Sequence, residues 1–179
     1  MLSPGKRESL FKNLKEIAED YIVLSISASE IDRLRSVSNL NRIEIEKMQE
    51  IINALEPDKA IVDALEANTK KFHEKLLSRI KNKKIHIIAE NFADRNYPEV
   101  AAASIIAKVQ RDREIAGLNK KCGCGSGYTS DERTISFLKN WIEKNKEFPD
   151  FVRKSWLTAQ WIINEKRQKS LRCFELANR

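Results

Sequence analysis

The sequence is poor in the residues that interrupt helices and in those that build disulfide frameworks. Its 179 residues include five glycines, four prolines and three cysteines. Hydrophobic residues make up 41% and charged residues 33%, a balance that excludes a disordered chain. No stretch approaches the roughly 18 uncharged apolar residues of a membrane-spanning helix. We therefore expect a helix-rich globular protein.

A secretory signal is also missing. The residues after the first methionine read Leu-Ser-Pro-Gly-Lys-Arg, without the apolar run of a signal peptide, so we expect a cytoplasmic protein. Three cysteines in a reducing compartment form no disulfide framework. Cys122 and Cys124 could bind a metal with His73 or His86, but this spacing is not that of a zinc knuckle or ribbon.

Positive charge is in excess. Lys and Arg number 33 against 26 Asp and Glu, which gives a net charge of +7 and a pI of about 9.3. Such an excess favours polyanionic partners, because each neutralised phosphate releases a condensed counterion. Charge alone does not identify a nucleic-acid-binding protein, since many basic proteins bind none.

Periodicity predicts alternating helices and strands, which indicates an α/β domain with parallel strand pairing. Three strands make a small sheet for so many helices. The predicted strands are residues 21–26, 59–63 and 85–89. The predicted helices are residues 4–19, 41–56 (with Asn41 and Glu44 as a capping box), about 72–80, a long helix from Pro98, and segments near 131–145 and 150–167.

Two carboxylates each follow an apolar strand. Asp63 ends one predicted strand and Asp94 follows the next. The carboxyl ends of parallel strands meet at one edge of a sheet, where two carboxylates could hold a divalent cation. The alternative is that each Asp caps the following helix.

Two further segments carry candidate binding residues. Gly125-Ser-Gly127-Tyr128 could bring backbone close to a ligand and stack Tyr128 on a sugar or base, or it could be a turn with a packed Tyr. Near the C-terminus, Gln168, Leu171 and Phe174 are spaced as a short helical anchor for a partner's apolar groove; a last turn docked on its own domain is the alternative.

Taken together, these segments resemble ribonuclease HII of the archaeal type over nearly the whole chain. The most specific part is Ala93-Asp94 with Tyr97-Pro98, running into Val-Ala-Ala-Ala-Ser-Ile-Ile-Ala-Lys-Val and Arg-Asp. Further matching segments are Leu2-Ser-Pro with Lys-Arg-Glu, Asn39-Leu-Asn with Glu44, Val62-Asp-Ala, Gly125-Ser-Gly-Tyr with Ser-Asp, Phe148-Pro, Val152-Arg, and Trp156 with Thr158.

The resemblance implies an enzyme, a hydrolase of the ribonuclease H-like fold that cuts the RNA strand of RNA–DNA hybrids and single ribonucleotides embedded in DNA, with Mn²⁺ or Mg²⁺. By resemblance, Asp63 and Asp94 are catalytic metal-binding acids. Tyr128, with Gly125 and Gly127, would pack on the deoxyribose at the RNA–DNA junction. Gln168, Leu171 and Phe174 would bind the sliding clamp used in DNA replication and repair. The expected parts are a partial catalytic domain (1–120), a helical substrate-binding region (121–166) and the clamp-binding tail (167–179).

The sequence also departs from the family pattern. That pattern opens with a strand carrying adjacent Asp and Glu, a Gly-Arg-Gly loop and a second strand, and none of these occurs before the Leu2-Ser-Pro segment. We therefore expect a ribonuclease H-like mixed sheet, flanked by helices, that lacks its first two strands. Phe92 and Leu157 stand where lysines are common in the family. Three readings stay open: a nuclease, a catalytically inactive remnant that binds hybrids and the clamp, or a basic helical interaction domain with no nucleic-acid specificity.

Overall fold

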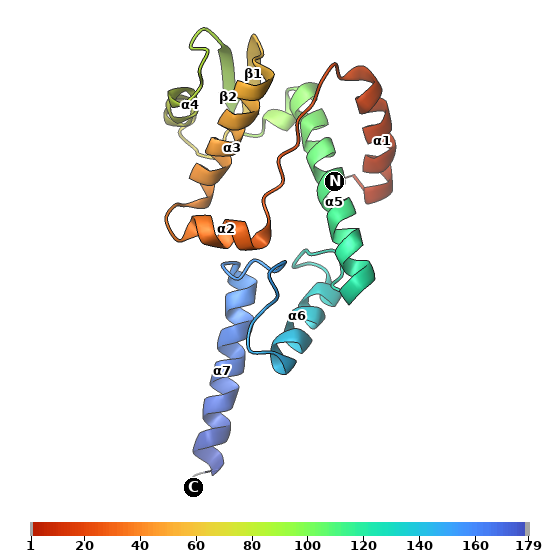
Figure 1. Cartoon of the computed structure of the whole chain (residues 1–179), viewed down its shortest axis with the longest axis vertical. Helices are drawn as coiled ribbons and strands as arrows, with labels where there is room; N and C mark the ends of the chain where they lie inside the picture. Colours follow the sequence, from red (N-terminus) through yellow and green to blue (C-terminus); the bar gives the residue numbers. More distant parts are fainter. Residues whose placement is uncertain (1, 178–179) are drawn as a thin grey trace. The chain divides into compact units, whose positions relative to one another are not determined.

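A computed structural model describes residues 2–177 and, of these, the side chains as far as residue 168. Three helices precede a strand–helix–strand segment, and helices follow it (Figure 1). The chain divides into two compact units: Met1–Ser25 with Ser38–Asp112, and Ile26–Val37 with Arg113–Arg179. Each unit has a hydrophobic core of its own. The functional boundaries expected at residues 120 and 166 stay a prediction.

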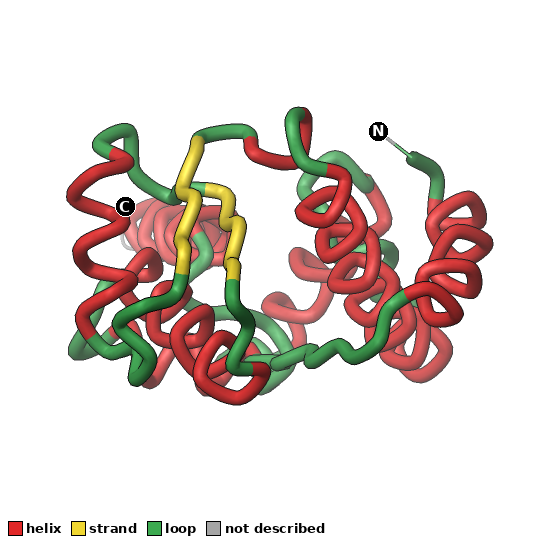
Figure 2. Tube along the Cα trace, turned by 90° about the horizontal axis from the view of Figure 1, so that it is seen from above, coloured by secondary structure: helices red, strands yellow, loops and turns green. Residues whose placement is uncertain are grey.

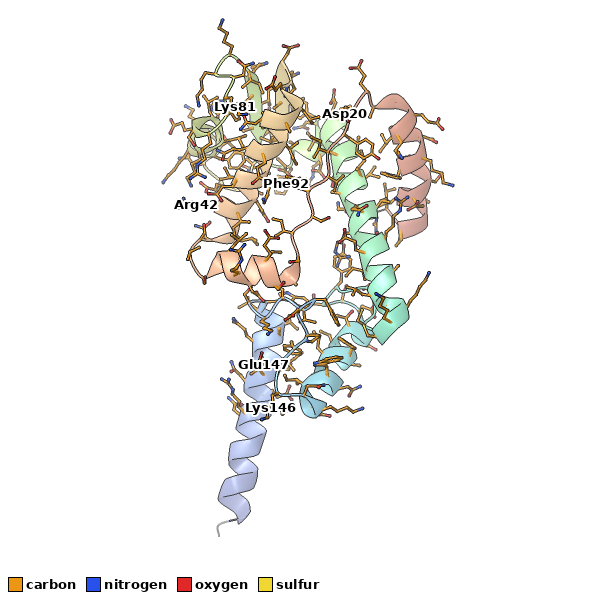
Figure 3. All side chains as sticks on the ribbon, viewed as in Figure 1. Asp20, Arg42, Lys81, Phe92, Lys146 and Glu147 are labelled. Carbon is orange, nitrogen blue, oxygen red and sulfur yellow. The ribbon has the colours of Figure 1, made fainter. Side chains whose placement is uncertain are left out.

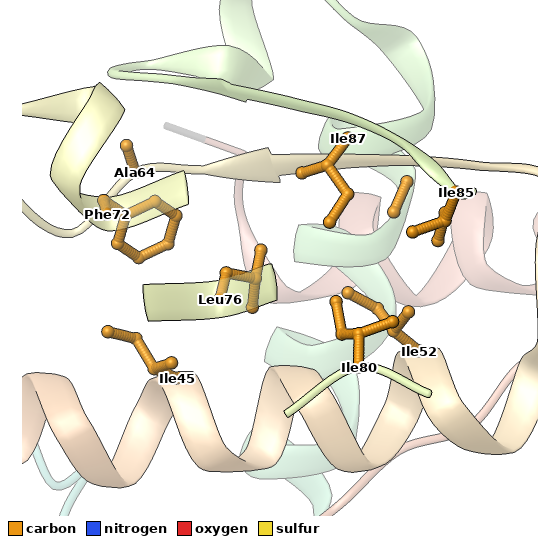
Figure 4. Packing of buried hydrophobic residues seen from close by; sticks show 9 residues of the cluster. Ile45, Ile52, Ala64, Phe72, Leu76, Ile80, Ile85 and Ile87 are labelled. Carbon is orange, nitrogen blue, oxygen red and sulfur yellow. The ribbon is translucent and has the colours of Figure 1, made fainter. Parts of the chain in front are cut away.

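The first unit contains a parallel pair of strands covered by two helices. Strand β1 (Lys59–Asp63) lies beside β2 (His86–Glu90) (Figure 2). The two strands pair in parallel, in a register that sets Asp63 opposite Glu90. Helices α3 (Leu40–Leu55) and α4 (Thr69–Ser78) supply apolar side chains to the core beneath the strands. Figure 4 shows this packing, with side chains from α3, α4, the strands and the adjoining loops: Ile45, Ile52, Ala64, Phe72, Leu76, Ile80, Ile85 and Ile87.

A second cluster of the same unit joins the first helix to the long one. Helix α1 (Pro4–Ile17) begins with Ser3 as its N-cap, whose hydroxyl accepts a hydrogen bond from the Lys6 N–H. Phe11 of α1 packs with Ile106 and Val109 of α5 (Pro98–Cys122). Buried Arg7 pairs with Asp112, and its Nε lies 3.1 Å from the Asp112 Oδ2.

The second unit is helical in the part that the structure describes. Helices α6 (Glu132–Lys144) and α7 (Leu157–Ala177) enclose a core that includes Leu138, Ile142, Phe148, Ala159 and Ile162. Helix α2 (Ala28–Arg35) belongs to the same unit. Its Asp32 carboxylate accepts hydrogen bonds from the Lys154 and Ser155 N–H groups at 2.6 and 2.9 Å, which lowers the pKa of Asp32 against the opposing effect of its partial burial.

Four predicted elements are confirmed within two residues: the strands at 59–63 and 85–89 and the helices from Pro4 and Pro98. Three sequence-based predictions are wrong in detail. Residues 21–26 form no strand, because β-branched residues make a strand only where a partner edge is available. Asn39, not Asn41, caps α3 through the Arg42 N–H. The last helix begins at Leu157, because Asp32 holds the preceding turn.

None of the helices that the structure describes is long and apolar enough to span a membrane.

Candidate functional site

The Asp63 carboxylate joins the ends of the two strands. It lies at the end of β1, exposed, and its Oδ1 accepts hydrogen bonds from the Phe92 N–H at 2.8 Å and the Ala93 N–H at 3.4 Å. These bonds tie β1 to the segment that follows β2, where the 3-10 helix η1 (Ala93–Arg95) begins. Only one carboxylate oxygen takes part in them, so Oδ2 remains available to a ligand.

Phe92 has an unusual backbone conformation at this edge. Its φ of 59° lies in the left-handed region, which costs a non-glycine residue about 1–2 kcal/mol. The hydrogen bond from its N–H to Asp63 helps to hold that conformation. The residue is 61% exposed (labelled in Figure 3), and the Arg95 guanidinium lies 4.7 Å from the centre of the Phe92 ring. Strained backbone of this kind is common at functional sites.

Asp94 lies in η1, directly after Ala93, which is fully buried. Ala93 therefore anchors the turn, while the Asp94 side chain is exposed to solvent. Strand β1 and η1 are in contact, so Asp63 and Asp94 lie at the same edge of the sheet. The alternative that each Asp caps a helix does not fit Asp63, because its carboxylate bonds to the segment after β2, and Asn68 caps the next helix.

A half-buried carboxylate closes the loop that carries Asp94. Glu90 accepts a 2.7 Å hydrogen bond from the Tyr97 hydroxyl and a 3.4 Å bond from the Asn96 amide. The bond to Glu90 raises the pKa of the Tyr97 hydroxyl, because the carboxylate stabilises the protonated phenol. Sequence reasoning missed this contact, although Tyr97-Pro98 belongs to the matching motif and marked the position.

The two aspartates suit a hard divalent cation. Mg²⁺ is commonly bound by one or two carboxylates together with waters and substrate phosphates, and Mn²⁺ accepts the same oxygen ligands. Asp63 has an oxygen to spare, and Asp94 is exposed beside it, so the pair fits this kind of partial site. Among the residues that the structure describes, no group of three or more His, Cys, Asp or Glu side chains is placed to hold a metal.

In the second unit, the Gly125–Tyr128 turn is fixed by side chains around it. The Gly125 N–H donates to the Asn119 amide oxygen at 2.9 Å, and the Ser126 N–H donates to Asp131 at 2.8 Å. The buried Thr134 hydroxyl accepts from the Gly127 N–H and donates to the Cys124 carbonyl, both at 3.0 Å.

Gly125 is required by this geometry. Its φ is +72°, and a Cβ there would lie 2.7 Å from the Thr134 hydroxyl and 2.8 Å from the Thr134 backbone nitrogen. Gly127 has the same positive φ. Tyr128 follows, and this residue is 40% exposed. The turn therefore presents an accessible aromatic ring on a rigid backbone.

Asp131 links the turn to α6. It is the N-cap of the helix, and its carboxylate also accepts two 3.1 Å bonds from the Arg133 guanidinium. The Arg133 bond and the Ser126 bond hold the pKa of Asp131 well below its ordinary value of 3.8. Asp131 belongs to the Ser-Asp of the matching motif, but the sequence predicted no role for it or for Arg133.

The predicted anchor in α7 is only partly described. Gln168 is exposed on the helix, whereas Leu171 and Phe174 lie outside the described side chains.

Comparison with known proteins identifies the family. A family model described as Ribonuclease HII matches residues 1–159. The chain belongs to the ribonuclease HII family. It is 46% identical over 162 residues to the ribonuclease HII of Methanothrix thermoacetophila, covering 89% of this chain and 76% of that relative. It is 45% identical to the ribonuclease HII of Methanobrevibacter smithii, covering 91% of this chain and 78% of the relative.

Two solved structures agree with the family in fold. The crystal structure of ribonuclease H2 from Pyrococcus horikoshii matches with a TM-score of 0.84 at 40% identity, covering 93% of this chain and 79% of that one. The structure of the PCNA:RNase HII complex from Archaeoglobus fulgidus matches with a TM-score of 0.80 at 40% identity, covering 88% and 75%. The predicted α/β fold of ribonuclease H type and the assignment to a hydrolase family are thereby confirmed.

Proposed function

We propose that this chain cleaves the RNA strand of RNA–DNA hybrids, including single ribonucleotides embedded in DNA, by hydrolysis assisted by two metal ions. The observation that carries the proposal is the hydrogen bonding of Asp63 to the segment after β2, which places Asp63 and Asp94 at one sheet edge. Membership of the ribonuclease HII family supports it. Such an activity serves DNA replication and repair.

The residues of the edge have distinct tasks in this proposal. Mg²⁺ or Mn²⁺ bound there would supply Lewis acidity and charge neutralisation for attack on a phosphodiester. Asp63 would bind through Oδ2 while Oδ1 keeps the loop in place. Asp94 would supply the second carboxylate. Glu90 and Tyr97 would hold the loop that carries Asp94, because their hydrogen bond spans it from end to end.

The Gly125–Tyr128 turn would hold the substrate. An aromatic ring stacks on the apolar face of a sugar or base without reading its sequence, and such contacts are worth about 1–3 kcal/mol per base. Gly127 would let the backbone approach the ligand, whereas Gly125 would act indirectly by letting the turn pack closely against Thr134. Tyr128 would therefore contact the deoxyribose beside the ribonucleotide.

The test is cleavage of a duplex bearing one embedded ribonucleotide, in Mn²⁺ and in Mg²⁺, by the chain and by its Asp94→Asn variant. We expect the chain to cut 5′ or 3′ of the ribonucleotide at a single position and the variant to be inactive. Calorimetric titration with Mn²⁺ should show weaker binding to the variant. Equal cleavage by both proteins would remove Asp94 from the catalytic set.

A second candidate function is binding of hybrids without cleavage. It is favoured by the arrangement of the described acids, which places no group of three His, Cys, Asp or Glu side chains to hold a metal, and by Phe92 in place of a lysine. In this case neither protein would cleave, but both would bind a hybrid more tightly than a DNA duplex of the same length.

We also propose that the tail binds a sliding clamp through Gln168, Leu171 and Phe174. The ribonuclease HII of Archaeoglobus fulgidus forms a complex with PCNA, a clamp of this kind. Phe174→Ala should abolish clamp binding in a pull-down while hybrid affinity stays unchanged. Asn164→Ala, at an exposed position of the same helix, is the matched control and should bind the clamp normally.

A further inference from the structure

A groove in the second unit is lined by cations and aromatic rings. It has a volume of about 690 Å³ and lies between the end of α5 and one face of α6. Lys121 comes from α5, and Arg133 and Lys144 come from the two ends of α6. Phe137 and Trp141 lie between them. No Asp or Glu is among the described residues that line the groove.

The helical period of α6 explains this arrangement. Arg133, Phe137, Asn140 and Lys144 follow at intervals of four, three and four residues, so they share one face of the helix. The opposite face, with Thr134, Leu138 and Ile142, is buried. The polar side chains of the groove are exposed and the two rings are half-buried, which makes a basic rim above an apolar floor.

The charges of the groove are not equally compensated. Arg133 is already paired with Asp131. For Lys121 and Lys144, no ion pair occurs among the residues that the structure describes. Two uncompensated ammonium groups, with amide donors from Asn140 and Asn145 nearby, favour an anionic ligand that can also lie against aromatic rings.

We propose that this groove binds the phosphodiester backbone of nucleic acid. A phosphate chain beside aromatic rings matches the combination of electrostatic and stacking contacts that proteins use for nucleic acids without sequence preference. The groove is also joined to the Gly125–Tyr128 turn, because the Asp131 carboxylate bonds both Ser126 of the turn and Arg133 of the groove. The inference rests on the proposed function only in choosing nucleic acid over an acidic peptide.

Two double variants test the proposal. Each removes two positive charges, one variant inside the groove and the other outside it. Lys121→Ala/Lys144→Ala removes both uncompensated cations of the groove, whereas Lys120→Ala/Lys146→Ala removes two exposed lysines of the same unit that do not line it. Binding of a fluorescent DNA duplex is measured by anisotropy over a series of salt concentrations with EDTA present, so that cleavage and metal-dependent binding do not contribute.

Each lost phosphate contact lowers the slope of log affinity against log salt by about 0.9. We therefore expect the groove variant to lose about 1.8 from this slope and about tenfold in affinity at moderate salt. The control should change affinity less than about twofold, because only its long-range charge is altered. Equal effects of the two variants would overturn the proposal. A failure of the cleavage test above would leave this comparison intact.

Cys122 gives a local readout of the same groove. It is half-buried and lines the groove, while Cys124 is buried, and burial together with the Cys122 thiol raises the pKa of Cys124 to about 11. Saturating duplex should slow alkylation of Cys122 by N-ethylmaleimide at least about tenfold, with peptide mapping to separate it from the other cysteines. Protection by a polyglutamate peptide but not by the duplex would overturn the proposal in favour of a protein partner.

Discussion

The sheet edge with Asp63 and Asp94 and the turn with Tyr128 are held in different ways. At the edge, one oxygen of the Asp63 side chain receives two backbone hydrogen bonds, and both Asp63 and Asp94 are exposed residues. In the turn, three successive N–H groups are each bonded to a side chain, and Gly125 lies where a Cβ would clash with Thr134. At the edge, the carboxylate charge is available to a ligand. In the turn, the backbone N–H groups are bonded within the protein, so the turn offers a ligand a fixed backbone and the Tyr128 ring.

The largest effect should come from removing charge at the edge without removing its hydrogen bonds. In Asp63→Asn the amide oxygen can still accept from Phe92 and Ala93, so stability should stay within about 1 kcal/mol of the original. Cleavage and Mn²⁺ affinity should fall by more than about 100-fold. This loss exceeds the roughly 10–100-fold that is common when a residue that only hydrogen-bonds to a metal ligand is changed. Asp63→Ala should lose the same activity and, in addition, about 1 kcal/mol of stability.

The contrast between the two Asp63 variants is measured by urea unfolding beside the cleavage assay. Full activity in Asp63→Asn would show that the edge needs the hydrogen bond and not the charge.

The turn should respond in stability first. Gly125→Ala adds a Cβ within 3 Å of Thr134 at a positive φ, and we expect a loss of about 2–4 kcal/mol from strain and overpacking together. Gly117→Ala is the matched control, because Gly117 lies in α5 with no atom near its Cβ position. That change should stabilise the protein by about 0.5–1 kcal/mol. Thermal unfolding of both variants distinguishes these outcomes, and equal melting temperatures would contradict the account of the turn.

A smaller loss is expected from Thr134→Val, which keeps the shape of the side chain. The buried hydroxyl bonds both the Gly127 N–H and the Cys124 carbonyl, so its removal leaves two polar groups without that partner. We expect a loss of about 1–3 kcal/mol in chemical unfolding. Thr129→Val, at an exposed position, should change stability by less than about 0.5 kcal/mol. Hybrid affinity should fall with the first change and not with the second.

The smallest expected effect is a change of stability at low pH. The pKa of Asp131 is lowered in the folded protein, so its contribution to stability is complete above its unfolded value of 3.8 and is lost as the pH falls through the lower folded value. The difference in melting temperature between the protein and Asp131→Asn should therefore be largest near neutral pH and shrink in strong acid. A difference that is independent of pH would mean that the Arg133 pair contributes nothing.

The elements that the sequence predicted well are those whose signals are local. Pro4 and Pro98 open helices, Pro57 follows the end of α3, and the apolar run before Asp63 is a strand. Residues 21–26 have the same β-branched character, but strand formation depends on a neighbour that local sequence does not specify. The choice of Asn39 over Asn41 as the cap depends on where the preceding turn ends, which a pattern of side chains leaves open.

For the site, the sequence predicted the position of the acids but not their supports. Asp63 and Asp94 could be placed at one edge because parallel strands end together. The bond from Tyr97 to Glu90 and the role of Thr134 in the turn depend on side-chain directions over seven residues of irregular chain. Contacts of this kind do not recur at a regular interval along the sequence, so the spacing of residue types does not predict them.

The pairing of Arg7 with Asp112 has a consequence for synthesis on the ribosome. The two residues are 105 positions apart, and Phe11 needs the same helix α5 to bury its ring. At about 5–20 residues per second, α1 emerges roughly 5–20 s before the residues that cover it. During that interval the apolar face of α1 and the Arg7 guanidinium, both buried in the folded protein, are exposed to solvent. Helix α1 is therefore a natural point of contact for a chaperone.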